Sequence, residues 1–366
     1  TPAWLGSARL YKETAQYTQA MEDINRALGQ QPTHEQALRL KTELQLTLRQ
    51  WDRALETVDE LASAHPEATG IAYLRGLSYL EKGALDKASS YAEKAMDESP
   101  KDAYTLLLAA RIDLVQEAYD DALKALNKIL RRQPNFSEGY HYRGIAYLKT
   151  GENRRARADF ERALNQEEER PETLLTLGDI YLSEGEIIRA QQTYEKAIHR
   201  FPQNMEGYIR RGELYQEIQQ YDSALADYDH VVASSPNVPS QVYLERGRTK
   251  VALKKYNLAL VDFNQVLRRQ PEDYMTYCER GHLYQLMGNF SKAEDDLTHA
   301  QRIAPTSPLP TYFLAAVHQE KDDLQQALEA INQAIDRDST YALAYNRRGE
   351  IFVEMETFEG ALRDFN

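Results

Sequence analysis

Small residues mark a regular period along the whole chain of 366 residues. Alanines recur at intervals of 34 residues, with a single interval of 35 at the proline- and serine-rich stretch 234–240. The series is Ala20, Ala54, Ala88, Ala122, Ala156, Ala190, Ala224, Ala259, Ala293, Ala327 and Ala361. A fixed period of this length is typical of repeat architectures. We predict one domain, 1–366, whose ten complete repeats begin at residues 1, 35, 69, 103, 137, 171, 205, 240, 274 and 308, with a shortened eleventh repeat at 342–366.

Apolar positions within each repeat follow the spacing of helices. Counted from the first residue of a repeat, positions 4, 7, 8 and 11 form one stripe, and positions 17, 20, 24 and 27 form another. Position 8 is Gly or Ala in ten of eleven repeats, and several repeats have Gly at position 15, between the stripes. Proline, which ends a helix, stands at position 32 in eight of the ten complete repeats. These prolines are Pro32, Pro66, Pro100, Pro134, Pro202, Pro236, Pro271 and Pro305. Each repeat therefore predicts a helical hairpin.

This pattern resembles the tetratricopeptide repeat over residues 1–366. The resemblance rests on a small residue at position 8, Tyr at 11, Ala at 20, an aromatic residue at 24, Ala at 27 and Pro at 32. The first repeat shows Trp4, Ala8, Tyr11, Tyr17, Ala20, Ile24, Ala27 and Pro32. The resemblance implies an all-α, right-handed superhelical solenoid of antiparallel helical hairpins, whose first helices line a concave channel. It implies no catalytic chemistry. Subtypes that clamp acidic C-termini or carry an asparagine ladder use Asn at position 6, and no repeat here has one.

Composition narrows the range of partners. The net charge of −13 argues against binding to nucleic acid and to anionic lipid, since both require a basic surface. No apolar run is long enough to cross a membrane, so we expect a soluble chain without membrane insertion. The single cysteine, Cys278, excludes an internal disulfide and leaves the compartment open between cytoplasm and periplasm. We expect no cofactor and no metal.

A second pattern links position 7 to position 23. Six repeats have Arg at position 7, and five of these have Asp at position 23, so we predict an ion pair between the two helices of each such hairpin. The predicted pairs are Arg143 with Asp159, Arg211 with Asp227, Arg246 with Asp262, Arg280 with Asp296, and Arg348 with Asp364. The sixth arginine is Arg75. Because each paired arginine has a carboxylate within its own hairpin, we interpret these pairs as structural instead of as a ligand-binding ladder.

Partner-binding residues are predicted on the first helices of three successive repeats. Tyr73, Tyr104 and Tyr142 lie at positions 5, 2 and 6, which the family resemblance directs into the channel. The remaining residues of the predicted set are Leu77, Leu107, Arg111, His141 and Ile145. An apolar groove with aromatic anchors suits an extended peptide or an amphipathic helix. For the leucines that stand at position 12, the alternative is that they only pack one first helix on the next; these are Leu46, Leu80, Leu114, Leu148 and Leu182.

Catalytic motifs are absent from the sequence. Cys278 and His282, four residues apart and predicted to face the channel, lack a third ligand or base, and we interpret them as a coincidence. His318 takes the position of a core tyrosine.

The sequence therefore predicts a non-catalytic scaffold that binds peptide segments or helices of other proteins. The alternative is a recognition or regulatory arm of a larger enzyme or of an envelope export or assembly machine. Leu362 and Phe365 in the shortened repeat lack a following helix. Either the parent protein continues, or a partner or a second copy of the chain covers this end.

Overall fold

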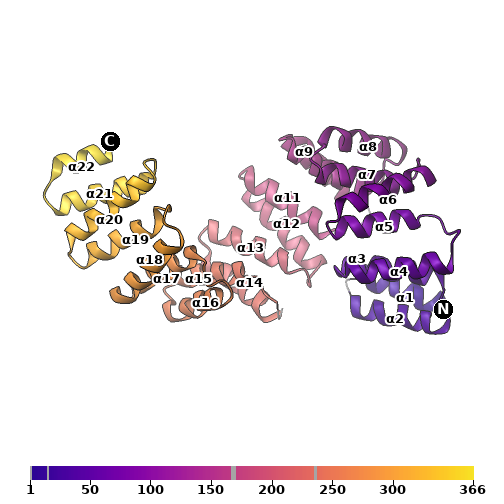
Figure 1. The fold of residues 1–366 in the computed structure, drawn as a ribbon, viewed down its shortest axis with the longest axis horizontal. Helices are drawn as coiled ribbons and strands as arrows, with labels where there is room; N and C mark the ends of the chain where they lie inside the picture. The colour runs from indigo at the N-terminus through magenta and orange to yellow at the C-terminus, as the bar shows by residue number, and fades with distance from the viewer. Residues whose placement is uncertain (1, 15, 166–169, 235–236) are drawn as a thin grey trace. The chain divides into compact units, whose positions relative to one another are not determined.

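The computed structural model describes residues 2–14, 16–165, 170–234 and 237–366. Pro236 of the proline series lies outside the described residues. Within these ranges the chain forms 22 α-helices and no strand (Figure 1). The helices are α1 Pro2–Glu13, α2 Tyr17–Gln30, α3 Glu35–Thr47, α4 Trp51–Ala64, α5 Ile71–Glu81, α6 Leu85–Glu98, α7 Ala103–Val115, α8 Tyr119–Arg132, α9 Ser137–Lys149, α10 Asn153–Leu164, α11 Pro171–Ser183, α12 Ile187–Arg200, α13 Met205–Glu217, α14 Tyr221–Ser234, α15 Ser240–Ala252, α16 Tyr256–Arg269, α17 Tyr274–Leu286, α18 Phe290–Ile303, α19 Leu309–Glu320, α20 Leu324–Arg337, α21 Ala342–Glu354 and α22 Phe358–Phe365.

The chain divides into two compact units, residues 1–207 and 208–366, with the boundary inside α13. In both units the two helices of a hairpin contact each other, and the second helix contacts the first helix of the next hairpin. Successive first helices also touch, as α5, α7 and α9 do. This neighbour-to-neighbour packing is that of a helical repeat solenoid. The predicted all-α fold of helical hairpins is confirmed. A single solenoid running through residues 1–366 stays a prediction.

The alanine series lies where helices meet most closely. Each of these alanines is buried, ten of them completely and Ala361 nearly so. Glycine at position 8 allows the other close approach within a hairpin. A Cβ atom added at Gly178 would lie 2.3 Å from the Tyr194 ring, and one at Gly247 would lie 2.5 Å from the Phe263 ring. The aromatic residue at position 24 therefore occupies the space that the missing side chain leaves.

Position 15 forms the turn between the two helices of a hairpin and has a positive φ. Gly151, with φ of 78°, fits this left-handed backbone conformation, which is sterically unfavourable for residues that have a Cβ atom. Glu117 takes the same place with φ of 61°. At this position the glycines with positive φ are Gly83, Gly151, Gly185 and Gly288, and the other residues are Arg49, Glu117, Gln219, Lys254, Asp322 and Glu356. From the sequence alone, this turn could be predicted only in the repeats that have glycine at position 15.

The last hairpin carries apolar side chains in contact with solvent. Leu362 is 62% exposed and Phe365 is 49% exposed. Among the described helices, none combines the length and the apolar character needed to span a bilayer.

Candidate partner-binding face and arginine clamps

The first helices α5, α7 and α9 lie side by side and bring most of the predicted binding residues together. We call the surface formed by Tyr73, Tyr104, Arg111 and Tyr142 the aromatic face. The rings of Tyr73 on α5 and Tyr104 on α7 lie 6.1 Å apart, and Tyr104 also contacts Phe136 edge-to-face at 5.3 Å. Tyr104 is 45% exposed, whereas Tyr73 and Tyr142 are half-buried. Of the three tyrosines, Tyr104 offers the largest open surface.

Arg111 joins the second part of the aromatic face. Its guanidinium lies 4.8 Å from the centre of the Tyr142 ring, and it forms an ion pair with Glu81 of α5. A cation above an aromatic ring and beside a carboxylate is held in one orientation. Arg111 therefore links three successive first helices, α5, α7 and α9, and fixes the shape of the face.

The hydroxyls of Tyr73 and Tyr142 remain protonated. Burial raises the pKa of Tyr73 and of Tyr142, and the Arg111 charge opposes this in both cases. The face thus presents two neutral, partly covered phenols, one exposed phenol and one neutralised arginine. Such a surface suits apolar and neutral polar groups better than a strongly charged ligand.

Two predicted binding residues, Leu107 and His141, are buried and do not lie on the open face. Leu107 belongs to the apolar core formed by α7, α8 and their neighbours. His141 Nδ1 lies 2.9 Å from Thr173 Oγ1 on α11, so this histidine joins hairpins. The side chains of Leu107 on α7 and His141 on α9 point between neighbouring first helices, where the adjacent hairpins cover them. Leu77 and Ile145 are half-buried at the margin of the face.

Each of the five predicted Arg and Asp pairs is brought together with two parallel hydrogen bonds. In every pair Nε and Nη2 of the arginine donate to the two carboxylate oxygens, with donor to acceptor distances of 2.5–2.9 Å. In the pair on α9 and α10, the side chain of Arg143 is 14% exposed and that of Asp159 is 4% exposed. This planar, two-bond geometry is the strongest that the two side chains can form.

Four of these arginines, Arg143, Arg246, Arg280 and Arg348, have a further partner that the sequence interpretation missed. Nη1 of Arg143 donates to Asn127 Oδ1 at 2.7 Å, and Asn127 lies on α8, the second helix of the preceding hairpin. The same third bond joins Arg246 to Asp229, Arg280 to Asn264 and Arg348 to Asn332. We call this arrangement of three side chains an arginine clamp. The signal was present in the sequence, because all four acceptors stand at position 25 of the preceding repeat.

The comparisons with known proteins agree with this architecture. Sequence models described as tetratricopeptide repeat match residues 1–34, 43–103, 79–142, 141–204, 175–239 and 276–307. The chain belongs to the tetratricopeptide repeat family. Tetratricopeptide repeats support a general role as a scaffold for interactions with other proteins.

Curated relatives of this tetratricopeptide repeat chain are much longer proteins. Superkiller complex protein 3 of Homo sapiens is 30% identical over 122 residues, which make up 32% of this chain and 8% of that protein. The protein of the same name from Mus musculus matches with the same identity and coverage. The match thus spans less than a tenth of the length of these relatives.

Solved structures share the fold. A tetratricopeptide repeat protein from Parabacteroides merdae superposes with a TM-score of 0.52 and 17% identity, over 71% of this chain and 98% of that one. The C-terminal part of a repeat-containing protein from Cytophaga hutchinsonii gives a TM-score of 0.53 and 18% identity, over 65% of this chain and 98% of that one. At these identities the likeness concerns the fold alone.

Cys278 does not face an open channel in the repeat chain. It is completely buried in the apolar core around α18 to α20, and burial raises the pKa of its thiol to about 12. The prediction that it faces the channel is wrong, because its position on α17 points toward the neighbouring hairpin. His282 is half-buried instead, with its ring 5.1 Å from that of Phe313. His318 is also half-buried, with Nδ1 3.7 Å from a carboxylate oxygen of Glu294.

First helices of the second compact unit carry paired charges where the aromatic face has rings. Arg248 of α15 contacts Glu245 on its own helix and Glu279 on α17, both at 2.9 Å. Gln285 donates to Glu320 of the next first helix at 2.8 Å. These contacts tie first helices to each other and satisfy the polar groups locally. Within the described parts of the chain, no group of three or more His, Cys, Asp and Glu side chains is arranged to hold a metal ion.

Proposed function

We propose that the chain is a non-catalytic scaffold that binds a segment of a partner protein, as an extended peptide or an amphipathic helix, across the aromatic face. The observation that carries this proposal is the exposure of Tyr104 between its half-buried neighbour Tyr73 and its buried neighbour Phe136. An aromatic ring supported on its sides and open above is a typical anchor at protein interfaces.

The rigidity of the surroundings supports the same proposal. Arg111 is held by Glu81 and by the Tyr142 ring, so the aromatic face exists before a partner arrives. A preformed surface loses little conformational entropy on binding, which strengthens association without adding contacts. The Arg111 guanidinium already has a carboxylate partner, so the peptide side chains that fit above it are apolar or neutral polar. Partner residues such as Leu, Met or Phe suit this surface best.

A second candidate function is the recognition or regulatory arm of a larger enzyme or envelope assembly machine. The observation that favours it is that the curated relatives match this chain over only 8% of their own, far longer sequences. In that case the aromatic face would bind the substrate or a subunit of the larger protein.

Photo-crosslinking tests the proposed face directly. Peptides that bind the full chain are first selected from a random library of displayed peptides, and a photoreactive phenylalanine analogue then replaces Tyr104. We expect the selected peptide to crosslink from position 104. The control places the same analogue at Val115, which is 60% exposed at the end of α7. Crosslinking from Val115 with none from position 104 would contradict the proposal, as would a failure to select any binding peptide.

A further inference from the structure

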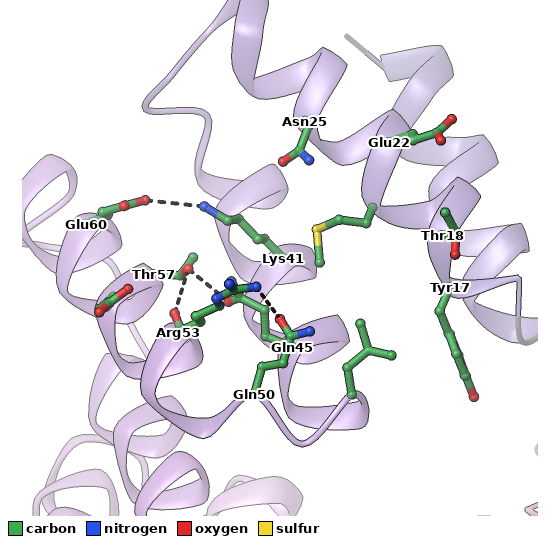
Figure 2. A pocket seen from close by; sticks show the side chains of 13 residues that line it. Tyr17, Thr18, Glu22, Asn25, Lys41, Gln45, Gln50, Arg53, Thr57 and Glu60 are labelled. Carbon is green, nitrogen blue, oxygen red and sulfur yellow. Dashed lines mark hydrogen bonds and ion pairs between the residues drawn. The ribbon is translucent and has the colours of Figure 1, made fainter. Parts of the chain in front are cut away.

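A surface pocket of about 540 Å³ lies between α2, α3 and α4, in the first two hairpins (Figure 2). Its polar lining comes from three helices, with Asn25 on α2, Lys41 and Gln45 on α3, and Thr57 and Glu60 on α4. The aromatic face on α5, α7 and α9 contributes no residue to it.

The pocket occupies the position at which other hairpins have an arginine clamp. The clamp uses position 7 of the first helix, position 23 of the same hairpin and position 25 of the preceding one. The second hairpin has Lys41 and Thr57 at the first two positions, the first hairpin has Asn25 at the third, and all three residues line the pocket. The acceptor on the preceding hairpin is thus retained, while the guanidinium and its carboxylate are replaced.

Two further positions of the second hairpin differ from those around a clamp. In the clamp of the fifth hairpin, the Arg143 guanidinium lies between the rings of Tyr140 and Tyr147, 5.4 Å and 5.9 Å from their centres. The matching positions of the second hairpin hold Leu38, which is buried, and Gln45. An amide in place of a tyrosine ring leaves open the space beside position 7.

Hydrogen bonding around Thr57 determines what the pocket offers a ligand. Thr57 Oγ1 lies 2.9 Å from Gln45 Oε1 and 3.0 Å from the carbonyl oxygen of Arg53. Both oxygens are acceptors for the Thr57 hydroxyl, which holds the Gln45 side chain at the wall of the pocket. Gln45 is 4% exposed and lines the pocket, and its amide oxygen keeps a second lone pair for a further donor.

Charges around the pocket favour a cation. Glu22, Glu56 and Glu60 line it, against the two basic residues Lys41 and Arg53. Lys41 Nζ lies 3.8 Å from Glu60 Oε2, which is beyond hydrogen-bonding distance. Glu22 and Glu56 form no ion pair within the described part of the chain. The lining therefore holds three carboxylates against two basic side chains, which leaves it with a net negative charge.

We propose that this pocket receives an arginine side chain from a partner protein, whose guanidinium takes the place that the chain's own arginine takes in the clamps. Asn25 and Gln45 supply neutral acceptors, and the unpaired glutamates supply the charge. The aliphatic part of the incoming side chain lies against Met21 and Leu48, which also line the pocket. Guanidinium has five donors and no acceptor, which matches a lining rich in oxygen.

A methyl NMR titration of the full chain tests the proposal, because the chain has six methionines and Met21 lies in the pocket. The probe is acetyl-Gly-Arg-Gly-amide, and its matched control replaces arginine by citrulline, which has a similar shape and no charge. We expect a saturable shift of the Met21 methyl signal, with a dissociation constant on the order of 1 mM and binding at least about tenfold weaker for the citrulline peptide. Equal shifts with both peptides, or no saturable shift with either, would overturn the proposal.

The variant Lys41→Arg with Thr57→Asp supplies the missing members of the clamp beside Asn25. It is expected to abolish the Met21 response, because the chain's own guanidinium then fills the pocket. Unchanged binding in this variant would also overturn the proposal. Should this variant not fold, Glu56→Gln with Glu60→Gln replaces it, with an expected loss of about tenfold or more in affinity. In the Tyr104→Ala variant the Met21 response should persist, which separates this site from the aromatic face.

Discussion

Arg143 and Asp159 form a two-bond ion pair across the fifth hairpin, with Nε to Oδ2 at 2.6 Å and Nη2 to Oδ1 at 2.8 Å. Asn127 adds a third bond from the hairpin before. The pair thus holds together both the two helices of one hairpin and two successive hairpins. Similar geometry recurs in hairpins of both compact units, so the clamps contribute to the packing of much of the chain.

Removing one member of this pair is expected to destabilise the chain more than removing both. Asp159→Leu leaves the Arg143 charge half-buried without its carboxylate, and a loss of about 3 kcal/mol in unfolding free energy is expected. Arg143→Met leaves the Asp159 carboxylate without its guanidinium partner, and a similar loss in unfolding free energy is expected. The double variant should lose much less than the sum, since no unpaired charge remains. Urea denaturation of the four chains measures these differences, and additive losses would show that the two residues act independently.

The turn at position 15 predicts a stabilising substitution. Glu117 has a left-handed backbone conformation and an exposed side chain, so Glu117→Gly should relieve backbone strain and raise the unfolding free energy by about 1 kcal/mol. The reverse change at the equivalent turn, Gly151→Ala, should lower it by a similar amount. Calorimetry of both variants tests this, and the same sign of change in the two would contradict it.

His141 predicts a dependence of stability on pH. Burial lowers its pKa to about 3, with Arg170 and Arg111 acting in the same direction. The folded state therefore holds the neutral form, so this stabilisation is complete above the unfolded pKa of about 6.5 and is lost as the pH falls toward 3. Between about pH 7 and pH 5 the cost from His141 alone should be about 2 kcal/mol.

The variant His141→Gln isolates that contribution. Its unfolding free energy should change less between the two pH values than that of the unchanged chain, because carboxylate effects are common to both. His199→Gln, at an exposed position of α12, serves as the control and should leave the pH dependence as it is. Identical pH profiles for His141→Gln and the unchanged chain would contradict the assignment to His141.

The repeat fold could be predicted from the sequence because the alanines, glycines and prolines act locally. A small residue is needed at Ala156, where helices meet, and glycine suits the turn at Gly151. The structural role of each position can therefore be predicted from the residue type and its spacing, without knowledge of distant contacts. Pairing of Arg143 with Asp159 could be predicted for a similar reason, since the two types occur together within one repeat.

Features that depend on the neighbouring hairpin were harder to predict. His141 and Leu107 share the first helices with Tyr104, but a rotation of a fraction of a turn separates an exposed side chain from one that the next hairpin covers. The prediction that Cys278 faces the channel was wrong for the same reason. The pocket around Gln45 could not be predicted from one residue, because it arises where several members of a repeating contact change together.

Binding of one selected peptide to the Tyr104→Ala, Tyr142→Ala variant is the most direct test of the central claim that partners bind the aromatic face. Calorimetric titration should show a dissociation constant at least about tenfold larger than for the unchanged chain, with a similar midpoint of thermal unfolding. The control variant, Leu258→Ala with Val261→Ala, removes two exposed apolar side chains of α16 and should bind as the unchanged chain does. An unaltered dissociation constant in the tyrosine variant would contradict the claim.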